Sequence, residues 1–179
     1  MNIEWSTVRK QDLEEAQLRH ASGAELSERD ERLLGRRESI DDFIGSHCFY
    51  LTVQPMIMDA LEEVLMRLPD DVLEMLMVER DVHVIFPEET GNTVYALNTV
   101  VPNDGVSKFS TRQKWFVVLA QYLTKGPHPR AVGTIAHELA HVVLEQAFLS
   151  STHSQSEEAQ ADELATQWGF GEEIEESKR

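Results

Sequence analysis

Hydrophobic residues are spread unevenly along the chain, and their spacing changes several times. Residues 1–39 are polar with scattered leucines, which predicts a polar helical N-terminal arm. From residue 40 the hydrophobic density rises, and residues 40–170 are expected to form one folded domain. Residues 171–179 are acidic, and we expect them to form a frayed tail.

Within the folded region, helical spacing alternates with strand-like segments. Residues 59–68 and 69–78 carry apolar side chains at the spacing of two helices. Turn formers and β-branched or aromatic residues then predict three strands, at residues 81–86, 93–101 and 115–120. We therefore expect an α+β fold with a small sheet of three or slightly more strands.

Two more helices complete the pattern. The first runs from residue 130 to about residue 149, with Pro129 in its first turn. The second begins after residues 150–153, where Ser154 and Glu157 match a capping box, and ends at Gly169.

Charge and composition narrow the possible partners. The formal net charge is −16, which repels phosphate backbones, so we expect no nucleic-acid partner. Cys48 is the single cysteine, which excludes an intramolecular disulfide and a cysteine-rich zinc site. No stretch approaches the ~20 apolar residues of a membrane span, and the first thirty residues lack a signal-like apolar run. A cytoplasmic location without membrane contact is the expectation.

The longest apolar helical pattern contains the sequence His-Glu-Leu-Ala-His at residues 137–141. Four residues of helix advance the direction of a side chain by about 400°, so His137 and His141 project from one face, as two ligands of one ion require. Glu138 lies beside them and can reach a metal-bound water rather than the metal. Desolvating unpaired polar groups costs roughly 1–3 kcal/mol each, which favours a shared task. A core network of the two histidines and the glutamate remains the alternative.

A catalytic zinc usually has three protein ligands, so a third ligand is needed. The extended metzincin pattern requires a glycine and a histidine where this chain has Leu144 and Ala147, which excludes that arrangement. The following helix offers other acids.

On that helix, Glu158, Asp162 and two small alanines share one stripe, and small residues allow a close approach to the histidine helix. Glu158 then faces the histidines, whereas Glu157 is turned by about 100° and serves the cap. Asp162, one turn further, can accept the free N–H of a ligand histidine. A solvated helix face is the alternative for each acid.

The HExxH sequence, followed by Glu158, Ala161 and Asp162 as ExxAD, resembles the gluzincin metallopeptidases over roughly residues 70–170. The resemblance is to the small ImmA/IrrE-like intracellular peptidases and the soluble core of the HtpX-like family. It implies a minimal zincin-like fold with one zinc ion per chain, bound by His137, His141 and Glu158. It also implies Glu138 as general base and acid, and Asp162 as the partner of His137.

In such proteins a sheet-edge strand ahead of the active-site helix pairs with the extended substrate. The residues at that place in this chain are Trp115, Phe116, Val117, Val118, Leu119 and Ala120.

The function expected from these features is zinc-dependent endopeptidase activity on a protein or peptide substrate, through a zinc-activated water with Glu138 as general base. One alternative is a zinc-binding regulatory or interaction module without turnover. Another is a proteolytic core that works inside an assembly, with the N-terminal arm as docking element. The oxyanion-stabilising donor is open among His128, His153, Tyr95 and Tyr122, and the sequence specifies neither the natural substrate nor the oligomeric state.

Overall fold

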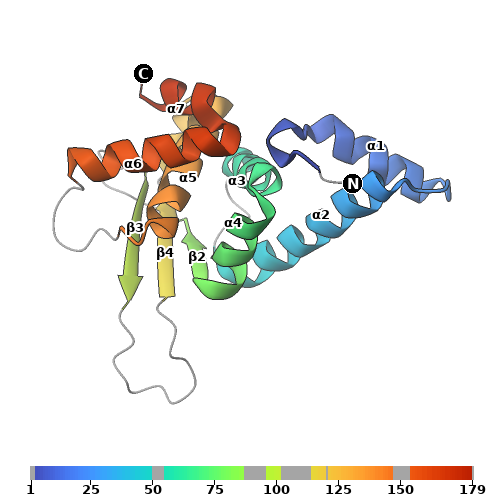
Figure 1. Ribbon diagram of the computed structural model, residues 1–179, viewed down its shortest axis with the longest axis horizontal. Coiled ribbons are helices and arrows are strands. Elements are labelled where there is room, and N and C mark those ends of the chain that lie inside the picture. Colours follow the sequence, from blue (N-terminus) through green and yellow to red (C-terminus); the bar gives the residue numbers. More distant parts are fainter. Residues whose placement is uncertain are drawn as a thin grey trace, which may run out of the picture.

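The structure is a computed structural model that describes residues 3–49, 55–86, 96–101, 114–119, 121–146 and 154–178, with the backbone alone at 96–101, 121 and 122. It is an α+β arrangement in which helices outnumber strands (Figure 1). Elements named η are short 3-10 or π-helical segments. In chain order the elements are η1 (Trp5–Thr7), α1 (Lys10–Ala21), α2 (Glu28–His47), β1 (Cys48–Phe49), α3 (Pro55–Arg67), α4 (Asp70–Glu74), η3 (Met75–Glu79), β2 (Val82–Ile85), β3 (Ala96–Val101), β4 (Lys114–Leu119), η4 (Gln121–Lys125), α5 (His128–Val143), α6 (Gln155–Ala165), η5 (Thr166–Phe170) and α7 (Gly171–Ser177).

The described strands form one mixed sheet in the order β1-β2-β4-β3. β1, β2 and β4 are parallel, and β3 runs antiparallel to β4, with Asn98 opposite Val117. Alternate residues of β2 and β4 are buried, as expected for strands with one face on a core: Val82, Val84, Trp115, Val117 and Leu119. The three predicted strands are confirmed over their described residues, and β1 adds a short fourth.

The prediction that residues 115–120 form a sheet edge is wrong. β4 has β2 on one side and β3 on the other, so its backbone hydrogen-bonding groups are used within the sheet and cannot pair with a substrate. Ala120 lies outside the described residues. The edge strands among those described are β1 and β3, and strand order is a long-range property that the local pattern of residues does not contain.

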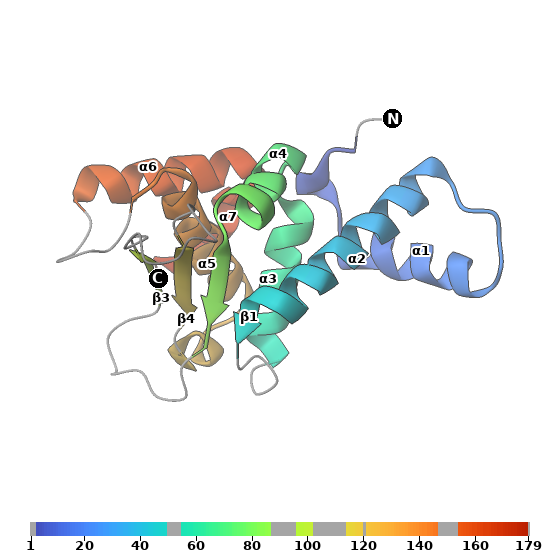
Figure 2. The ribbon, with the colours of Figure 1, turned by 90° about the horizontal axis from the view of Figure 1, so that it is seen from below.

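Helix α5 lies at the centre of the structure. Its residues from Ala131 to Val142 are mostly buried, and it packs against β3, β4, α3, α6 and α7. Figures 1 and 2 show α6 crossing over α5 and the sheet, while the α1–α2 pair projects to the other side of α3. Both helices of the candidate site therefore belong to the part of the molecule that contains the sheet.

The N-terminal arm is more firmly attached than its polarity predicts. The expected boundary between residues 39 and 40 falls inside α2, which continues to His47. Trp5, Leu13 and Leu33 of the arm join the buried core. The Arg36 guanidinium lies 4.1 Å from the Trp5 ring centroid. The arm is thus packed as part of the fold.

Arg36 also satisfies the end of α3. Its Nη2 donates to the carbonyls of Leu65 and Leu68 at 2.7 and 2.6 Å, and its Nη1 lies 2.7 Å from Asp70 Oδ1. Helix ends leave carbonyls without intrahelical donors, so this side chain supplies the missing hydrogen bonds. Burial nonetheless lowers the pKa of Arg36 to about 10, and the group remains charged at neutral pH.

The C-terminal segment also differs from expectation. Ser154 and Glu157 form the predicted capping box, and Gly169 adopts φ 95°, which turns the chain as predicted. The residues beyond it are not a frayed tail, because α7 follows and buries Ile174 against the core. Among the described residues, no helix combines the length and apolar character that a membrane crossing requires.

Candidate metal centre

Helix α5 brings its two histidines together on one face. The rings of His137 and His141 meet edge to face with centroids 4.6 Å apart, and their Nε2 atoms are 3.0 Å apart. The side chain of His141 is 1% exposed and that of His137 is 16% exposed. One helical turn between them produces this arrangement.

Helix α6 supplies the third group. Ala161 and Ala165 are fully buried, which lets α6 approach α5 closely. Glu158 Oε2 lies 3.1 Å from His137 Nε2, and Glu158 Oε1 lies 3.7 Å from His141 Nε2. The structure therefore brings the three predicted ligands together, with their ligand atoms within 4.8 Å of one another.

The neighbouring acid Glu157 takes the other predicted position. Its Oε2 accepts from the backbone N–H of Ser154 at 2.7 Å, and its own N–H donates to Ser154 Oγ at 3.2 Å. This capping box sets the rotation of α6, so Glu157 points to the helix start and Glu158 to the histidines.

The outward-facing nitrogen of each histidine has an acceptor. His137 Nδ1–H donates to Asp162 Oδ1 at 2.8 Å, the partnership that the sequence predicts. His141 Nδ1–H donates to Gln146 Oε1 at 2.8 Å. The Gln146 amide nitrogen donates to Gln160 Oε1 at 2.7 Å, which leaves its oxygen for the histidine. These partners fix the proton of each neutral ring on Nδ1.

The inner atoms of the site are consequently all acceptors. With protons on both Nδ1 atoms, each neutral ring presents a lone pair at Nε2, and the Glu158 carboxylate adds a negative charge. A positive centre, either an added proton or a metal ion, would satisfy acceptors that face one another in this way. A metal ion satisfies all three acceptors at once.

The distances fit such an ion. Metal–ligand bonds of about 2.0–2.1 Å in a tetrahedron place the ligand atoms roughly 3.3 Å apart. The separations of 3.0 Å between the two Nε2 atoms, 3.1 Å from Glu158 to His137 and 3.7 Å from Glu158 to His141 bracket that value. Two imidazoles and one carboxylate are also the ligand types of three-ligand zinc sites, which keep one position open.

Gln146 is a site residue that sequence reasoning missed. The helix expected to run to residue 149 instead ends at Val143, and Glu145 adopts φ 58°. The N–H groups of Glu145 and Gln146 then donate to the carbonyls of Val142 and His141, which is a Schellman turn. Glycine usually marks such a turn, and its absence here removed the local signal.

Lys178 is a second residue that the sequence did not reveal. It follows α7, and its Nζ lies 3.1 Å from Asp162 Oδ2. This hydrogen bond raises the pKa of Lys178 above its usual value, so the lysine is charged at neutral pH. Lys178 and Asp162 are sixteen positions apart, and they meet because the chain turns at Gly169. The spacing of hydrophobic residues does not predict such a contact.

Glu138 lies on α5 between the two histidines, and it is buried at 9% exposed. Among the described residues, the carboxylate that converges with the histidines belongs to Glu158, whereas Glu138 is outside that group. Glu138 is therefore not one of the three converging groups.

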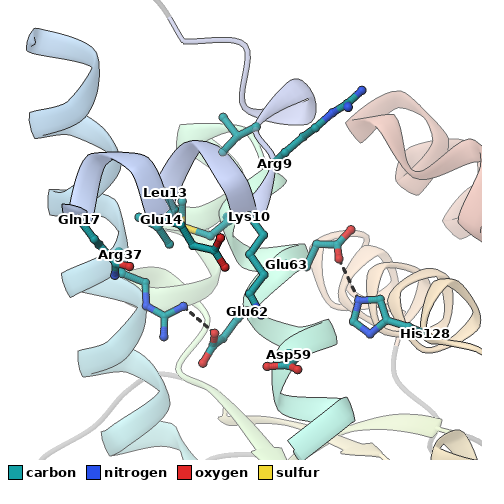
Figure 3. A pocket seen from close by; sticks show the side chains of 12 residues that line it. Arg9, Lys10, Leu13, Glu14, Gln17, Arg37, Asp59, Glu62, Glu63 and His128 are labelled. Carbon is teal, nitrogen blue, oxygen red and sulfur yellow. Dashed lines mark hydrogen bonds and ion pairs between the residues drawn. The ribbon is translucent and has the colours of Figure 1, made fainter. Parts of the chain in front are cut away.

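His128 is too distant for the oxyanion role considered for it. Its ring nitrogen lies 2.9 Å from Glu63 Oε2, and it lines a cavity of about 340 Å³ between α1, α3 and the start of α5 (Figure 3). His137 is nine positions beyond His128 on the same helix, about 14 Å along the axis. His153 and Tyr95 lie outside the described residues, as does the side chain of Tyr122.

Comparisons of the chain with protein-family models, with curated proteins and with solved structures found no match.

Proposed function

We propose that this chain is a zinc-dependent peptidase that hydrolyses peptide bonds in a protein or peptide substrate. The observation that carries the proposal is the group of inward-facing acceptors, His137 Nε2, His141 Nε2 and the Glu158 carboxylate, with both Nδ1 protons held from outside by Asp162 and Gln146. The HExxH and ExxAD resemblance supports the same assignment.

The ligand count favours a catalytic over a structural ion. Structural zinc sites have four protein ligands, whereas three leave a position for water or substrate. Among the described residues, the converging set has three members, and none of them is a cysteine. A bound zinc ion would polarise the scissile carbonyl of the substrate and lower the pKa of its own water toward about 7.

Each residue of the site then has a separate task. His137, His141 and Glu158 hold the ion, while Asp162 and Gln146 orient the imidazoles. Glu138 takes the proton of the attacking water and passes it to the leaving amine. An extended substrate pairs with a strand at a sheet edge, and among the described strands β3 is the six-residue edge strand on the α6 side of the sheet (Figure 1).

The Glu138→Gln variant tests the proposal. The variant keeps the ligand set, so it should retain zinc, but it loses the base, so turnover should fall by about 10²–10⁴-fold. Glu163→Gln, an exposed acid-to-amide change on α6, is the matched control and should keep full activity. The assay counts new N-termini by mass spectrometry after incubation with a peptide library prepared from a cell extract.

The alternative, a module that binds zinc without turnover, predicts a different result. In that case the zinc-loaded wild type would generate no more new termini than Glu138→Gln, and the peptidase proposal would be withdrawn. A protein captured intact by both forms would then identify the binding partner.

A further inference from the structure

The C-terminal helix reaches the candidate metal centre through one hydrogen-bonded chain. Lys178 Nζ lies 3.1 Å from Asp162 Oδ2, and Asp162 Oδ1 accepts from His137 Nδ1 at 2.8 Å. Both oxygens of this carboxylate are therefore engaged, one by the lysine and one by the predicted ligand histidine.

Close packing between α7 and α5 determines where Lys178 lies. A Cβ built on Gly133 of α5 would lie 2.1 Å from the Glu173 carbonyl oxygen, so the two backbones are in direct contact. Ile174, one residue further along α7, is 2% exposed. Lys178 is one helical turn beyond Ile174 and projects from the same side, toward α6.

The start of α7 is anchored as well. Arg67 of α3 binds Glu173 Oε1 at 2.6 Å and the Gly169 carbonyl at 2.8 Å, and its guanidinium lies 4.3 Å from the Phe170 ring centroid. The position of Lys178 therefore follows from contacts on α3 and α5 and does not depend on Asp162 alone.

We propose that Lys178 is a positioning residue of the metal centre, which holds the Asp162 carboxylate in the orientation that fixes His137 for metal binding. The inference rests on the proposed zinc site but not on peptidase activity. It makes the C-terminal helix a determinant of zinc affinity.

Positioning and charge predict opposite effects for the loss of Lys178. Its positive charge repels a bound cation, so a purely electrostatic role predicts tighter zinc binding when the charge is removed. The lysine side chain is 49% exposed, however, and solvent and salt screen such a charge strongly. The direct hydrogen bond to Asp162 is screened less, because its two atoms are 3.1 Å apart and the carboxylate is 26% exposed. We therefore expect the positioning effect to be the larger one.

The test measures zinc affinity by competition with a chromophoric chelator. Lys178→Ala should bind zinc on the order of tenfold more weakly, the lower end of the effect of outer-sphere changes. Lys178→Arg, which keeps a donor, should restore the affinity. Glu175→Gln removes the other acidic neighbour of this lysine, at 3.3 Å, and should leave the affinity unchanged.

Two further measurements separate positioning from a general structural effect. The Nδ1–H proton of His137 should give a slowly exchanging imidazole resonance in zinc-loaded wild type, a broadened one in Lys178→Ala and a restored one in Lys178→Arg. In an Asp162→Asn background, Lys178→Ala should have no further effect on affinity, because the residue through which the lysine acts is already changed.

The outcomes are distinguishable from those of the proposed function. Equal affinity of wild type and Lys178→Ala, or tighter binding by Lys178→Ala, overturns the positioning role. Wild type that binds no zinc overturns both proposals. Weaker binding by Lys178→Ala in a protein that cleaves no peptide supports this inference and refutes only the peptidase.

Discussion

Substitution of Gly133 by alanine is the sharpest test of how α7 is packed. The added methyl carbon would lie 2.1 Å from the Glu173 carbonyl oxygen, 2.5 Å from its carbon and 3.0 Å from the Ile174 nitrogen. All three atoms belong to backbone, so no side-chain rotation relieves the contact. Non-bonded heavy atoms settle at roughly 3.5–4.0 Å, so the two helices must separate by about 1 Å or more.

The expected cost follows from two opposing effects. Overpacking of a core typically costs about 1–3 kcal/mol, while alanine gains up to about 1 kcal/mol over glycine within a helix. Packing is the larger effect, and we expect Gly133→Ala to lower the free energy of unfolding by roughly 1–2 kcal/mol. For a chain of this length the midpoint temperature should fall by on the order of 5 °C.

Gly35→Ala is the matched control. Gly35 lies within α2, it is exposed, and a Cβ added there meets no atom within 4 Å. The same change should stabilise the protein at this site by up to about 1 kcal/mol. The assay is urea and thermal unfolding of both variants beside wild type. Equal stabilisation by both substitutions would contradict the close contact between α5 and α7.

Three other predictions follow from particular residues. Glu158→Gln should weaken zinc binding strongly, whereas Glu157→Gln should cost only about 1 kcal/mol of helix-cap stability. The reverse result in a zinc titration would show that the rotation of α6 described above is wrong. Hydrogen bonds from Arg19 and then from Ser27 lower the pKa of Asp30 to about 2. The stability that the ionised carboxylate contributes to the fold is therefore complete above its usual pKa near 4 and is lost as the pH falls toward 2. The stability difference between wild type and Asp30→Asn should shrink over that window, and a constant difference would refute this prediction. Burial raises the pKa of the Cys48 thiol to about 12, so alkylation of the folded protein near pH 8 should be about a thousandfold slower than that of a free thiol, and rapid labelling would contradict this burial.

The convergence of His137, His141 and Glu158 was predictable because local rules determine much of it. Helical spacing alone places His137 and His141 on one face. The capping box at Ser154 sets the rotation of α6, and that rotation turns Glu158 toward the histidines and Glu157 toward the helix start. Their meeting across two helices required only that the intervening alanines be small.

The features that were missed depend on contacts that local patterns do not contain. The place of β4 inside the sheet follows from pairing with β2 and β3. The end of α5 at Val143 uses a Schellman turn with Glu145 in the left-handed region, where glycine would have been the recognisable signal. Lys178 reaches Asp162 only because α7, expected to be frayed, packs on Gly133.

The most direct test of the account is the zinc content of the purified protein. Mass spectrometry of metal in protein prepared without added zinc, followed by titration with zinc, should give about one ion per chain for wild type. His137→Ala should lose this binding, while His128→Ala, a histidine change at the start of the same helix, should retain it. Wild type with no bound metal and no uptake on titration would contradict the assignment of His137, His141 and Glu158 as a metal centre.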